Sequence, residues 1–462
     1  MRRIVGAVLI LATGAASAGA ISLTDTWQAA QAHDPRFAAA QAQWEAGRAH
    51  AAEGRALWLP TLTATGTTVR RDLESRTQGA AFAAPGFGST NGVDFRTSVN
   101  GGTATRWALV AEQPLFDAAR FADSTMQKDA ARIAEAQFRD AQQELIIRSA
   151  RRYFEVLNAR AQLDTLERLR AAAENARAAA QARYEAGDIP ATDMREAQAL
   201  ADTIGVQELD ARTALTLAEA AFADLTGLDA ANLADLRESA TAELPPPDTL
   251  ESWIQRALAG SSQLRIKRLA LTTATAQVAR YGALNSPQLS LVAQFGRDSL
   301  HGIGDFGVTD ITVREASIGV QATVPLFTGG ERRAQRHEAR GLEHQSQAEL
   351  NGAEQQVRQQ TRAGWLALTT AAARVRALER LRGSAASRLD ATQLGVEIGD
   401  RTALELLNAQ ADSLRAEADF RHSQTDWLLA GLQLRAVAGE LTAADLDSVD
   451  RRLGPAAAAA IR

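Results

Sequence analysis

Few residues of this chain have the types and spacing that catalysis or metal binding requires. The 462 residues include no cysteine, which excludes disulfides, thiolate metal sites and cysteine nucleophiles. His337 and His344 are seven residues apart, beside Glu338 and Glu343, on a predicted helix. The two histidines of a zinc-binding helix are four apart, so we interpret this group as a solvated helix face. The glycine-rich stretch 302–307 lacks the lysine and the following helix of a phosphate-binding loop. We therefore expect no enzyme, no metal site and no cofactor.

Charged residues do stand beside two similar turns. Residues 187–190 have the sequence Gly-Asp-Ile-Pro and residues 399–402 have the sequence Gly-Asp-Arg-Thr, and both patterns are typical of turns. Asp193 follows the first turn, and Arg401 lies in the second. Judged from the residues alone, these are solvated surface charges that contribute little to stability. The net charge of -5 gives no reason to expect a nucleic acid as a partner.

Long helices must position these turns. Residues 117–186 contain no glycine and no proline and are rich in strong helix formers, which predicts one helix about 100 Å long. A return helix over 191–225 follows the first turn. Residues 331–398 predict a second long helix, and its return helix has apolar residues at heptad spacing, broken by Arg421 and Thr425. Helices of this length need to pack against one another in a coiled-coil-like layer.

Alternating polar and apolar residues predict four strands, near 61–67, 103–113, 288–295 and 317–324, with a polar loop over 71–102. Strands of roughly 8 to 11 residues match the length that crosses a bilayer at a tilt. Four strands cannot close a barrel, and open sheet edges are not tolerated in hydrocarbon, so copies of the chain must combine. Two chains would give about eight strands, and three would give about twelve with room for a lumen. The alternative is a small soluble sheet that caps a helical rod.

The order of these elements occurs twice, which predicts a tandem duplication. The first repeat spans residues 21–228 and the second spans 250–441. A proline-containing linker over 229–249 joins them, and a tail over 442–462 follows.

The N-terminal segment predicts a secretory signal peptide over residues 1–20. Two arginines precede a short apolar run, and small residues permit cleavage after Ala18 or Ala20. The run is too short to span a bilayer. After the signal, residues 24–58 predict a helix with Thr24 as its N-cap, whose first turns are kinked or start later because Pro35 falls inside the span.

Two further details complete a family pattern. A Pro-Leu-Phe sequence follows the second strand at 114–116 and the fourth strand at 325–327. With the duplicated unit and the tip glycines Gly187 and Gly399, these features resemble the TolC family of outer-membrane channel proteins over nearly the whole chain after the signal. The resemblance implies a homotrimer whose twelve-stranded β-barrel lies in the outer membrane of a Gram-negative bacterium. A long α-helical coiled-coil barrel would extend into the periplasm. The expected fold class is therefore an α+β membrane protein, internally duplicated.

The resemblance also carries functional positions onto this chain. The family's periplasmic gate falls on Thr192 and Asp193 after the first turn and on Arg401 in the second. Val396 stands where the family has a linking tyrosine, so this chain lacks one link of the gate.

A second set of positions concerns the pore and the partners. The family's acidic constriction falls on Glu405 and Asn408, so one carboxylate of the pair is retained. In a trimer, a ring of three Glu405 carboxylates would attract cations. Gly187 and Gly399 are the expected docking points for a periplasmic adaptor, because glycine permits close approach of another backbone.

We interpret the chain as the outer-membrane channel of a tripartite type I secretion system that exports a protein, such as an RTX-type toxin. It resembles the family members that have no lipid-anchor cysteine. No nucleotide-binding motif occurs, so the energy for export must come from a partner, which the resemblance implies to be an inner-membrane ABC transporter. The first alternative is a drug or small-molecule efflux channel working with an RND-type pump. The second alternative is a soluble periplasmic coiled-coil scaffold.

Overall fold

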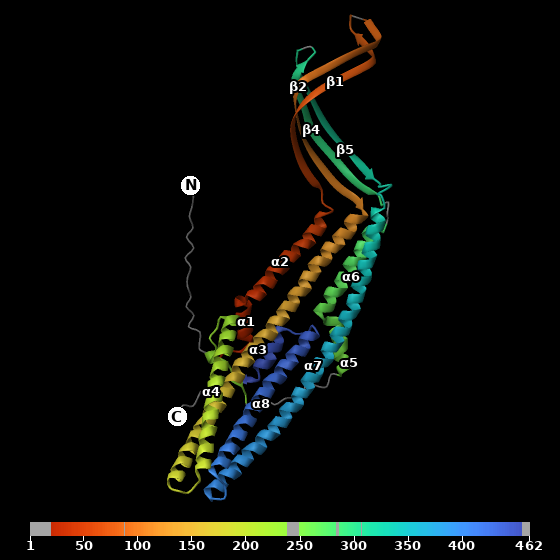
Figure 1. Ribbon diagram of the computed structural model, residues 1–462. Coiled ribbons are helices and arrows are strands. Elements are labelled where there is room, and N and C mark those ends of the chain that lie inside the picture. Colours follow the sequence, from red (N-terminus) through yellow and green to blue (C-terminus); the bar gives the residue numbers. More distant parts are fainter. Residues whose placement is uncertain (1–19, 87, 238–248, 283–285, 306, 455–462) are drawn as a thin grey trace. The chain divides into compact units, whose positions relative to one another are not determined.

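The computed structural model describes residues 20–86, 88–237, 249–282, 286–305 and 307–454 (Figure 1). The chain divides into two compact units. The helical unit contains residues up to 45, 134–268 and 349 onward, and the strand unit contains 46–133 and 269–348. The predicted signal peptide except its last residue, the prolines of the predicted linker and the end of the predicted tail lie outside the described residues.

The main elements occur in the same order twice. The first series is α1 (Leu23–His33), α2 (Pro35–Ala56), β1 (Thr61–Ala84), β2 (Gly88–Asp117), α3 (Ala118–Glu185) and α4 (Ala191–Thr226). The second is α5 (Leu250–Gly260), α6 (Ser262–Arg280), β4 (Gln288–Gly304), β5 (Gly307–Thr323), α7 (Glu331–Glu397) and α8 (Ala403–Val437). Between and after them lie η1 (Ala230–Asn232), β3 (Asp235–Leu236), α9 (Ala443–Asp450) and β6 (Leu453–Gly454).

The two long helices predicted from the sequence are confirmed. The helix α3 has 68 residues and α7 has 67, and each ends within one residue of the predicted boundary. The five glycines of α7 do not interrupt it. Among the described residues, no helix combines the length and the apolar character needed to cross a membrane.

The start of the first helix differs from the prediction. The N-cap of α1 is Ser22, whose hydroxyl accepts a hydrogen bond from the amide of Asp25. Thr24 lies inside the helix, where its amide and hydroxyl both donate to the carboxylate of Asp450 in α9. The disturbance expected at Pro35 is a complete break, because α1 ends at His33 and Pro35 begins α2. A proline fits the first position of a helix but not its interior.

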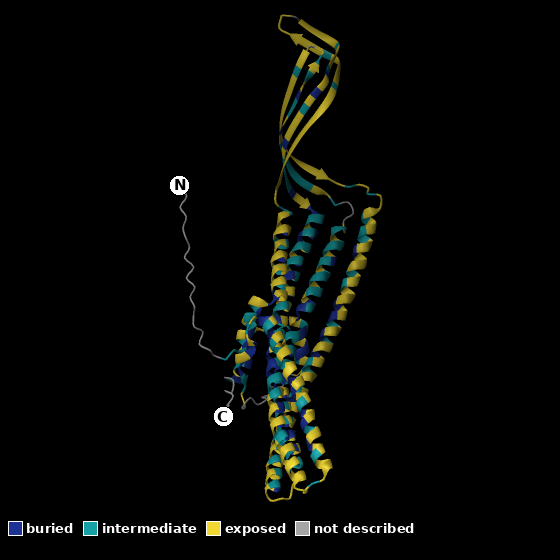
Figure 2. Cartoon of the chain, turned by 60° about the vertical axis from the view of Figure 1, so that its left-hand side comes forward, coloured by how far each residue is buried: buried dark blue, intermediate teal, exposed yellow. Residues whose placement is uncertain are grey.

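The four long strands form one antiparallel sheet in the order β1-β2-β4-β5. The loop predicted over 71–102 is wrong. The strand β1 continues to Ala84 and β2 begins at Gly88, so the two strands have 24 and 30 residues. Beyond Arg71 most residues of this hairpin are exposed, with Val99 a buried exception, and no polar–apolar alternation marks the strands in the sequence (Figure 2). The register between β1 and β2 shifts at three points, which is typical of bulges.

The predicted alternation holds in the part of the sheet next to the helices. Residues that face each other across antiparallel strands share a face. One face carries Leu109 and Phe295, which are paired in the register of β2 and β4. The other face carries Val110 and Gln294, the next pair along. On β1 the threonines 61, 63, 65 and 67 all fall on this second face.

The described part of the predicted linker is not a featureless connection. Its strand β3 pairs with β6, close to the end of the described chain. Beside this pair, the hydroxyl oxygen of Tyr153 in α3 lies 3.0 Å from the carbonyl oxygen of Ile21 and 2.6 Å from that of Ala234. Tyr153 is completely buried. The N-terminal segment, the linker and the C-terminal segment therefore meet at one place on α3.

Candidate functional site: the two hairpin tips

The first tip is a glycine turn between α3 and α4. Gly187 has a φ of 82°, in the left-handed region that glycine adopts without the steric cost of a side chain. Its amide donates to the carbonyl of Tyr184 (3.0 Å), and the amide of Asp188 donates to the carbonyl of Arg183 (2.8 Å). These two bonds define a Schellman motif, which satisfies carbonyls that the helix end leaves without partners.

The second tip, between α7 and α8, repeats this geometry. Gly399 also has a φ of 82°. Its amide donates to the carbonyl of Val396 (3.1 Å), and the amide of Asp400 donates to the carbonyl of Gly395 (2.8 Å). Both tip glycines are exposed, and a Cβ built on either would meet nothing within 4 Å (Figure 2). The turns predicted from the sequence are confirmed, whereas adaptor docking at the two glycines remains a prediction.

The two tips begin their return helices differently. At the second tip Thr402 is the N-cap of α8 and forms a capping box with Glu405. The amide of Thr402 donates to the Glu405 carboxylate (2.8 Å), and the amide of Glu405 donates back to the Thr402 hydroxyl (3.2 Å). At the first tip Pro190 takes the N-cap position of α4 and supplies no side-chain bond.

Arg401 has a partner on its own chain. Its guanidinium donates to the carboxylate of Glu405 at 2.9 Å. The hydrogen bond from the Thr402 backbone and then the one from Arg401 lower the pKa of Glu405 below its ordinary value. The same bond raises the pKa of Arg401. The stem of Arg401 lies over Gly395, where a Cβ would come within 2.6 Å of the arginine Cγ.

Asp193 occupies the position in the first tip that Glu405 occupies in the second. Each lies six residues after its tip glycine, in the first turn of its return helix. Ile189 stands where the second tip has Arg401, so Asp193 has no guanidinium beside it from its own turn. Its carboxylate accepts a hydrogen bond from the hydroxyl of Thr192 (3.1 Å), and both side chains are exposed.

The chain by itself does not join Asp193 to Arg401. Within the described part of one chain, the ion pair of Arg401 goes to Glu405. The gate contact between Asp193 and Arg401 therefore stays a prediction, and it would have to form in competition with Glu405. Asn408, the second predicted constriction residue, is exposed one turn farther along α8.

Sequence reasoning missed the pairing of Arg401 with Glu405, although two signals were present. The Thr-x-x-Glu sequence at 402–405 is that of a capping box. An arginine four residues from a glutamate is a common ion pair at a helix start. Both signals are local, so the bonds of Glu405 within its own turn can be predicted without the tertiary structure.

An apolar cluster positions α8 against the α3–α4 hairpin. Ala173 of α3, Ile204 of α4 and Leu407 of α8 are all buried in one core cluster. Three of its six buried members are alanine, and the others are leucine or isoleucine. Leu407 lies two residues after Glu405, so the beginning of α8 packs beside the first hairpin.

Ion pairs connect the two helices of each hairpin. In the first hairpin the buried carboxylate of Glu208 bonds to Arg170 (2.7 Å) and to Arg212 (2.9 Å). The hydrogen bond from Arg170 lowers the pKa of Glu208, so the group stays ionised. In the second hairpin Arg388 of α7 pairs with Asp412 of α8.

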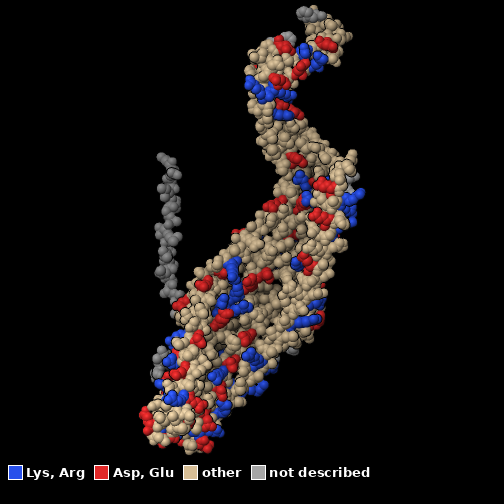
Figure 3. All heavy atoms as spheres, viewed as in Figure 1, with Lys and Arg blue, Asp and Glu red and all other residues tan. Residues whose placement is uncertain are grey.

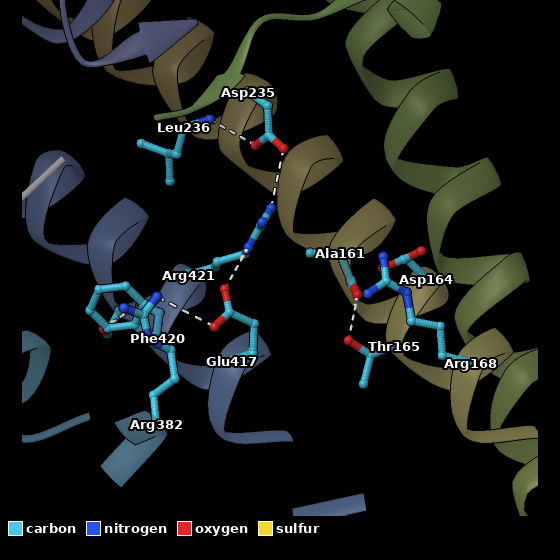
Figure 4. Close-up of polar contacts among 11 residues, drawn as sticks. Ala161, Asp164, Thr165, Arg168, Asp235, Leu236, Arg382, Glu417, Phe420 and Arg421 are labelled. Carbon is cyan, nitrogen blue, oxygen red and sulfur yellow. Dashed lines mark hydrogen bonds and ion pairs between the residues drawn. The ribbon is translucent and has the colours of Figure 1, made fainter. Parts of the chain in front are cut away.

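Farther along α8, the residues that break the heptad pattern make specific polar contacts. Figure 4 shows Arg421 between Asp235 of β3 and Glu417, each at 3.2 Å. Burial lowers the pKa of Arg421, but the two carboxylates outweigh burial and the net shift is upward. Thr425 is buried, and its hydroxyl accepts a hydrogen bond from the side-chain amide of Asn158 of α3 at 3.0 Å. The hydroxyl proton has two acceptors within reach, the Asn158 amide oxygen at 3.1 Å and the His422 carbonyl at 2.7 Å. The breaks in the apolar pattern are thus cross-links between elements.

Comparison with known proteins places this architecture in a family. The family described as "Outer membrane efflux protein" matches residues 26–228 and again 253–440. The chain is 30% identical over 455 residues to the alkaline protease secretion protein AprF of Pseudomonas aeruginosa, covering 97% of this chain and 91% of AprF. It is 25% identical over 444 residues to the outer membrane protein TolC of Vibrio cholerae, covering 96% of each chain.

The fold agrees with a solved structure. The crystal structure of a membrane protein from Pseudomonas aeruginosa superimposes with a TM-score of 0.70, at 21% identity, over 91% of this chain and 95% of that one. The two matched segments coincide with the two series of elements described above. The chain therefore belongs to the outer membrane efflux protein family, and it is an internally duplicated, TolC-like channel protein of the outer membrane rather than an enzyme.

Proposed function

We propose that the chain is the outer-membrane channel of a type I secretion system, through which a protein substrate leaves the cell. The observation that carries the proposal is the similarity to a protease secretion protein along 97% of the chain, including both hairpin tips. A secreted protease or an RTX-type toxin is the class of substrate we infer. Small-molecule efflux is the second candidate, and the description of the family favours it.

The edges of the sheet support assembly as a homotrimer. The outer edges of β1 and β5 have no partner strand among the described residues of one chain. In hydrocarbon such edges must be paired, so β5 of one copy would pair with β1 of the next. Two copies would give about eight strands filled by their own side chains, whereas three would give about twelve strands around a lumen.

The partners are a periplasmic adaptor and an inner-membrane transporter. A passive channel needs an external energy source, which an ABC transporter would supply for protein export and an RND-type pump for efflux. The tips at Gly187 and Gly399 support adaptor docking, because both are exposed and open space surrounds both.

The gate would lie at the same tips. In a trimer, three Asp193 and three Glu405 carboxylates would alternate around the opening, each in the first turn of its return helix. Arg401 neutralises Glu405 in its own chain. Arg401 can therefore hold the closed state only by exchanging Glu405 for Asp193 or by bridging the two. The ring as a whole would attract cations.

Gene deletion tests the function. Loss of the gene should abolish the appearance of a secreted protein in the medium, while the same protein accumulates inside the cell. Unchanged secretion with increased accumulation of a fluorescent dye would reject protein export in favour of efflux.

Fractionation and cross-linking test the assembly. The protein should extract with outer membranes as a heat-sensitive trimer. Recovery in the soluble periplasm would support a scaffold instead, and cross-linking that yields only monomers and dimers would reject the trimer.

A further inference from the structure

The apolar face of the sheet ends at a row of aromatic and basic side chains. The register defines successive rows across β2, β4 and β5, taken from the helix-joined ends toward the hairpin ends. They are Ala111–Ala293–Ile318, then Leu109–Phe295–Ala316, then Trp107–Arg297–Arg314. On the face visible in Figure 3, a part of the sheet toward the helices is largely uncharged, and basic and acidic side chains both gather beyond it.

The height of the apolar part fits a membrane. From Leu289 to Arg297 the strand β4 advances eight residues, or about 26 Å, which becomes roughly 20 Å when the strand is tilted. The apolar band of outer-membrane barrels is about 25 Å tall, with aromatic residues at its borders. Trp107 and Phe295 form an edge-to-face pair at this border, with ring centroids 5.6 Å apart.

Arg297 and Arg314 lie directly opposite each other at the same border. Both side chains are exposed. Like charges directly opposite in a sheet repel each other. The neighbouring acids do not relieve this repulsion, because Asp298 and Glu315 fall on the other face, where Asp298 pairs with Arg106 at 3.2 Å.

The adjacent rows on the same face also lack carboxylates among the described residues. The row beyond the arginines is Thr105–Ser299–Thr312, and the row before them is Leu109–Phe295–Ala316. The contact described for either guanidinium is a long one, from Arg297 to the hydroxyl of Thr312 at 3.5 Å. The two cations thus share an uncompensated position beside an aromatic ring.

We propose that Arg297 and Arg314 together bind the phosphate group of an outer-leaflet lipid headgroup. Two guanidinium groups present parallel N–H donors that match the oxygens of a phosphate, and its negative charge removes their mutual repulsion. The apolar rows below them would contact the acyl chains of the same lipid. This inference rests on the proposed function, which places the hairpin ends of the strands outside the cell.

The test uses full-length protein purified in detergent from outer membranes. Wild type is compared with the Arg297→Gln/Arg314→Gln double variant. Arg106→Gln is the matched control, because it lies at the same height on the opposite face. Each protein is titrated with a bisphosphorylated diglucosamine lipid, with the dephosphorylated lipid and with inorganic phosphate, and native mass spectrometry counts the bound lipid.

We expect the double variant to bind the phosphorylated lipid about 10- to 30-fold more weakly than wild type. Arg106→Gln should stay within about twofold, and dephosphorylation should weaken wild-type binding as much as the double substitution. Arg297→Lys/Arg314→Lys keeps the charge but not the paired donors, and should show an intermediate loss. This variant also serves if the glutamine variant does not assemble.

Two results would overturn the inference. The first is equal binding of the phosphorylated lipid by wild type and the double variant. The second is displacement of the lipid by inorganic phosphate at the same concentration, which would make this a site for free phosphate. If the proposed function itself were wrong, the protein would be absent from outer membranes, and this would be seen at purification, before any lipid titration.

Discussion

Replacing Gly399 by alanine tests what holds the second tip in place. The φ of 82° is strained for any residue with a Cβ, yet the added Cβ would meet nothing within 4 Å. The cost is therefore backbone strain alone, about 1–2 kcal/mol for a left-handed residue. Opening of the turn breaks the bond from the Asp400 amide to the Gly395 carbonyl. Hydrogen exchange at this amide should become roughly 5- to 30-fold faster, because exchange there follows local opening.

A glycine inside α7 provides the control. A Cβ added at Gly383 would also meet nothing within 4 Å, but the backbone there is helical. Gly383→Ala should therefore leave exchange at the tip unchanged or slow it slightly, because alanine is favoured over glycine in a helix by about 0.8–1 kcal/mol. Equal exchange at Asp400 in wild type and Gly399→Ala would refute the strain argument. Bulky residues at Gly187 or Gly399 should in addition impair export while the trimer still assembles, and full export from both would reject adaptor docking there.

Three further predictions concern the two tips and α8. Arg401→Ser should raise single-channel conductance in a planar bilayer and Asp193→Asn should do the same, whereas wild-type conductance in both would make the pair a bystander. Glu405→Ala should reduce cation preference. Because the pKa of Glu405 is lowered, the part of the cation preference that Glu405→Ala removes should persist as the pH falls through the ordinary glutamate range and disappear only below it; loss of that part already within the range would contradict the assignment. Thr425→Val leaves Asn158 without its buried partner, at about 1–3 kcal/mol, and should lower the midpoint of thermal unfolding while Thr425→Ser restores it. An unchanged midpoint in Thr425→Val would show that the contact contributes nothing.

The duplication makes the difference between the tips informative. Both glycine turns have the same two Schellman bonds, and the second has a further bond from the Arg401 amide to the Gly395 carbonyl (3.1 Å). The side chains differ, because the second tip has Arg401 and a capping box where the first has Ile189 and Pro190. Of the two equivalent carboxylates, Glu405 is thus neutralised by an arginine of its own turn and Asp193 is not. We expect Asp193 to influence ion selectivity at least as strongly as Glu405.

The sequence alone determined the elements that depend on local chemistry. The absence of glycine and proline over 68 residues was enough to delimit α3, because helix propensity and the next turn signal act over a few residues. The turns at Gly187 and Gly399 could be predicted for the same reason. The apolar half of the sheet was also readable, because one face there differs in polarity from the other.

Tertiary structure decided what depends on distant partners. The hairpin beyond Arg71 is mostly exposed and has no clear apolar face, so the cross-strand pairing of β1 with β2 defines it. The hydrogen bond from Thr24 to Asp450 could not be predicted from the sequence, because 426 residues separate the two. Arg421 and Thr425 looked like defects in an apolar stripe, because their partners Asp235 and Asn158 come from other elements. A periodic pattern records which face is buried, but a buried polar group is stable only where the fold supplies its partner.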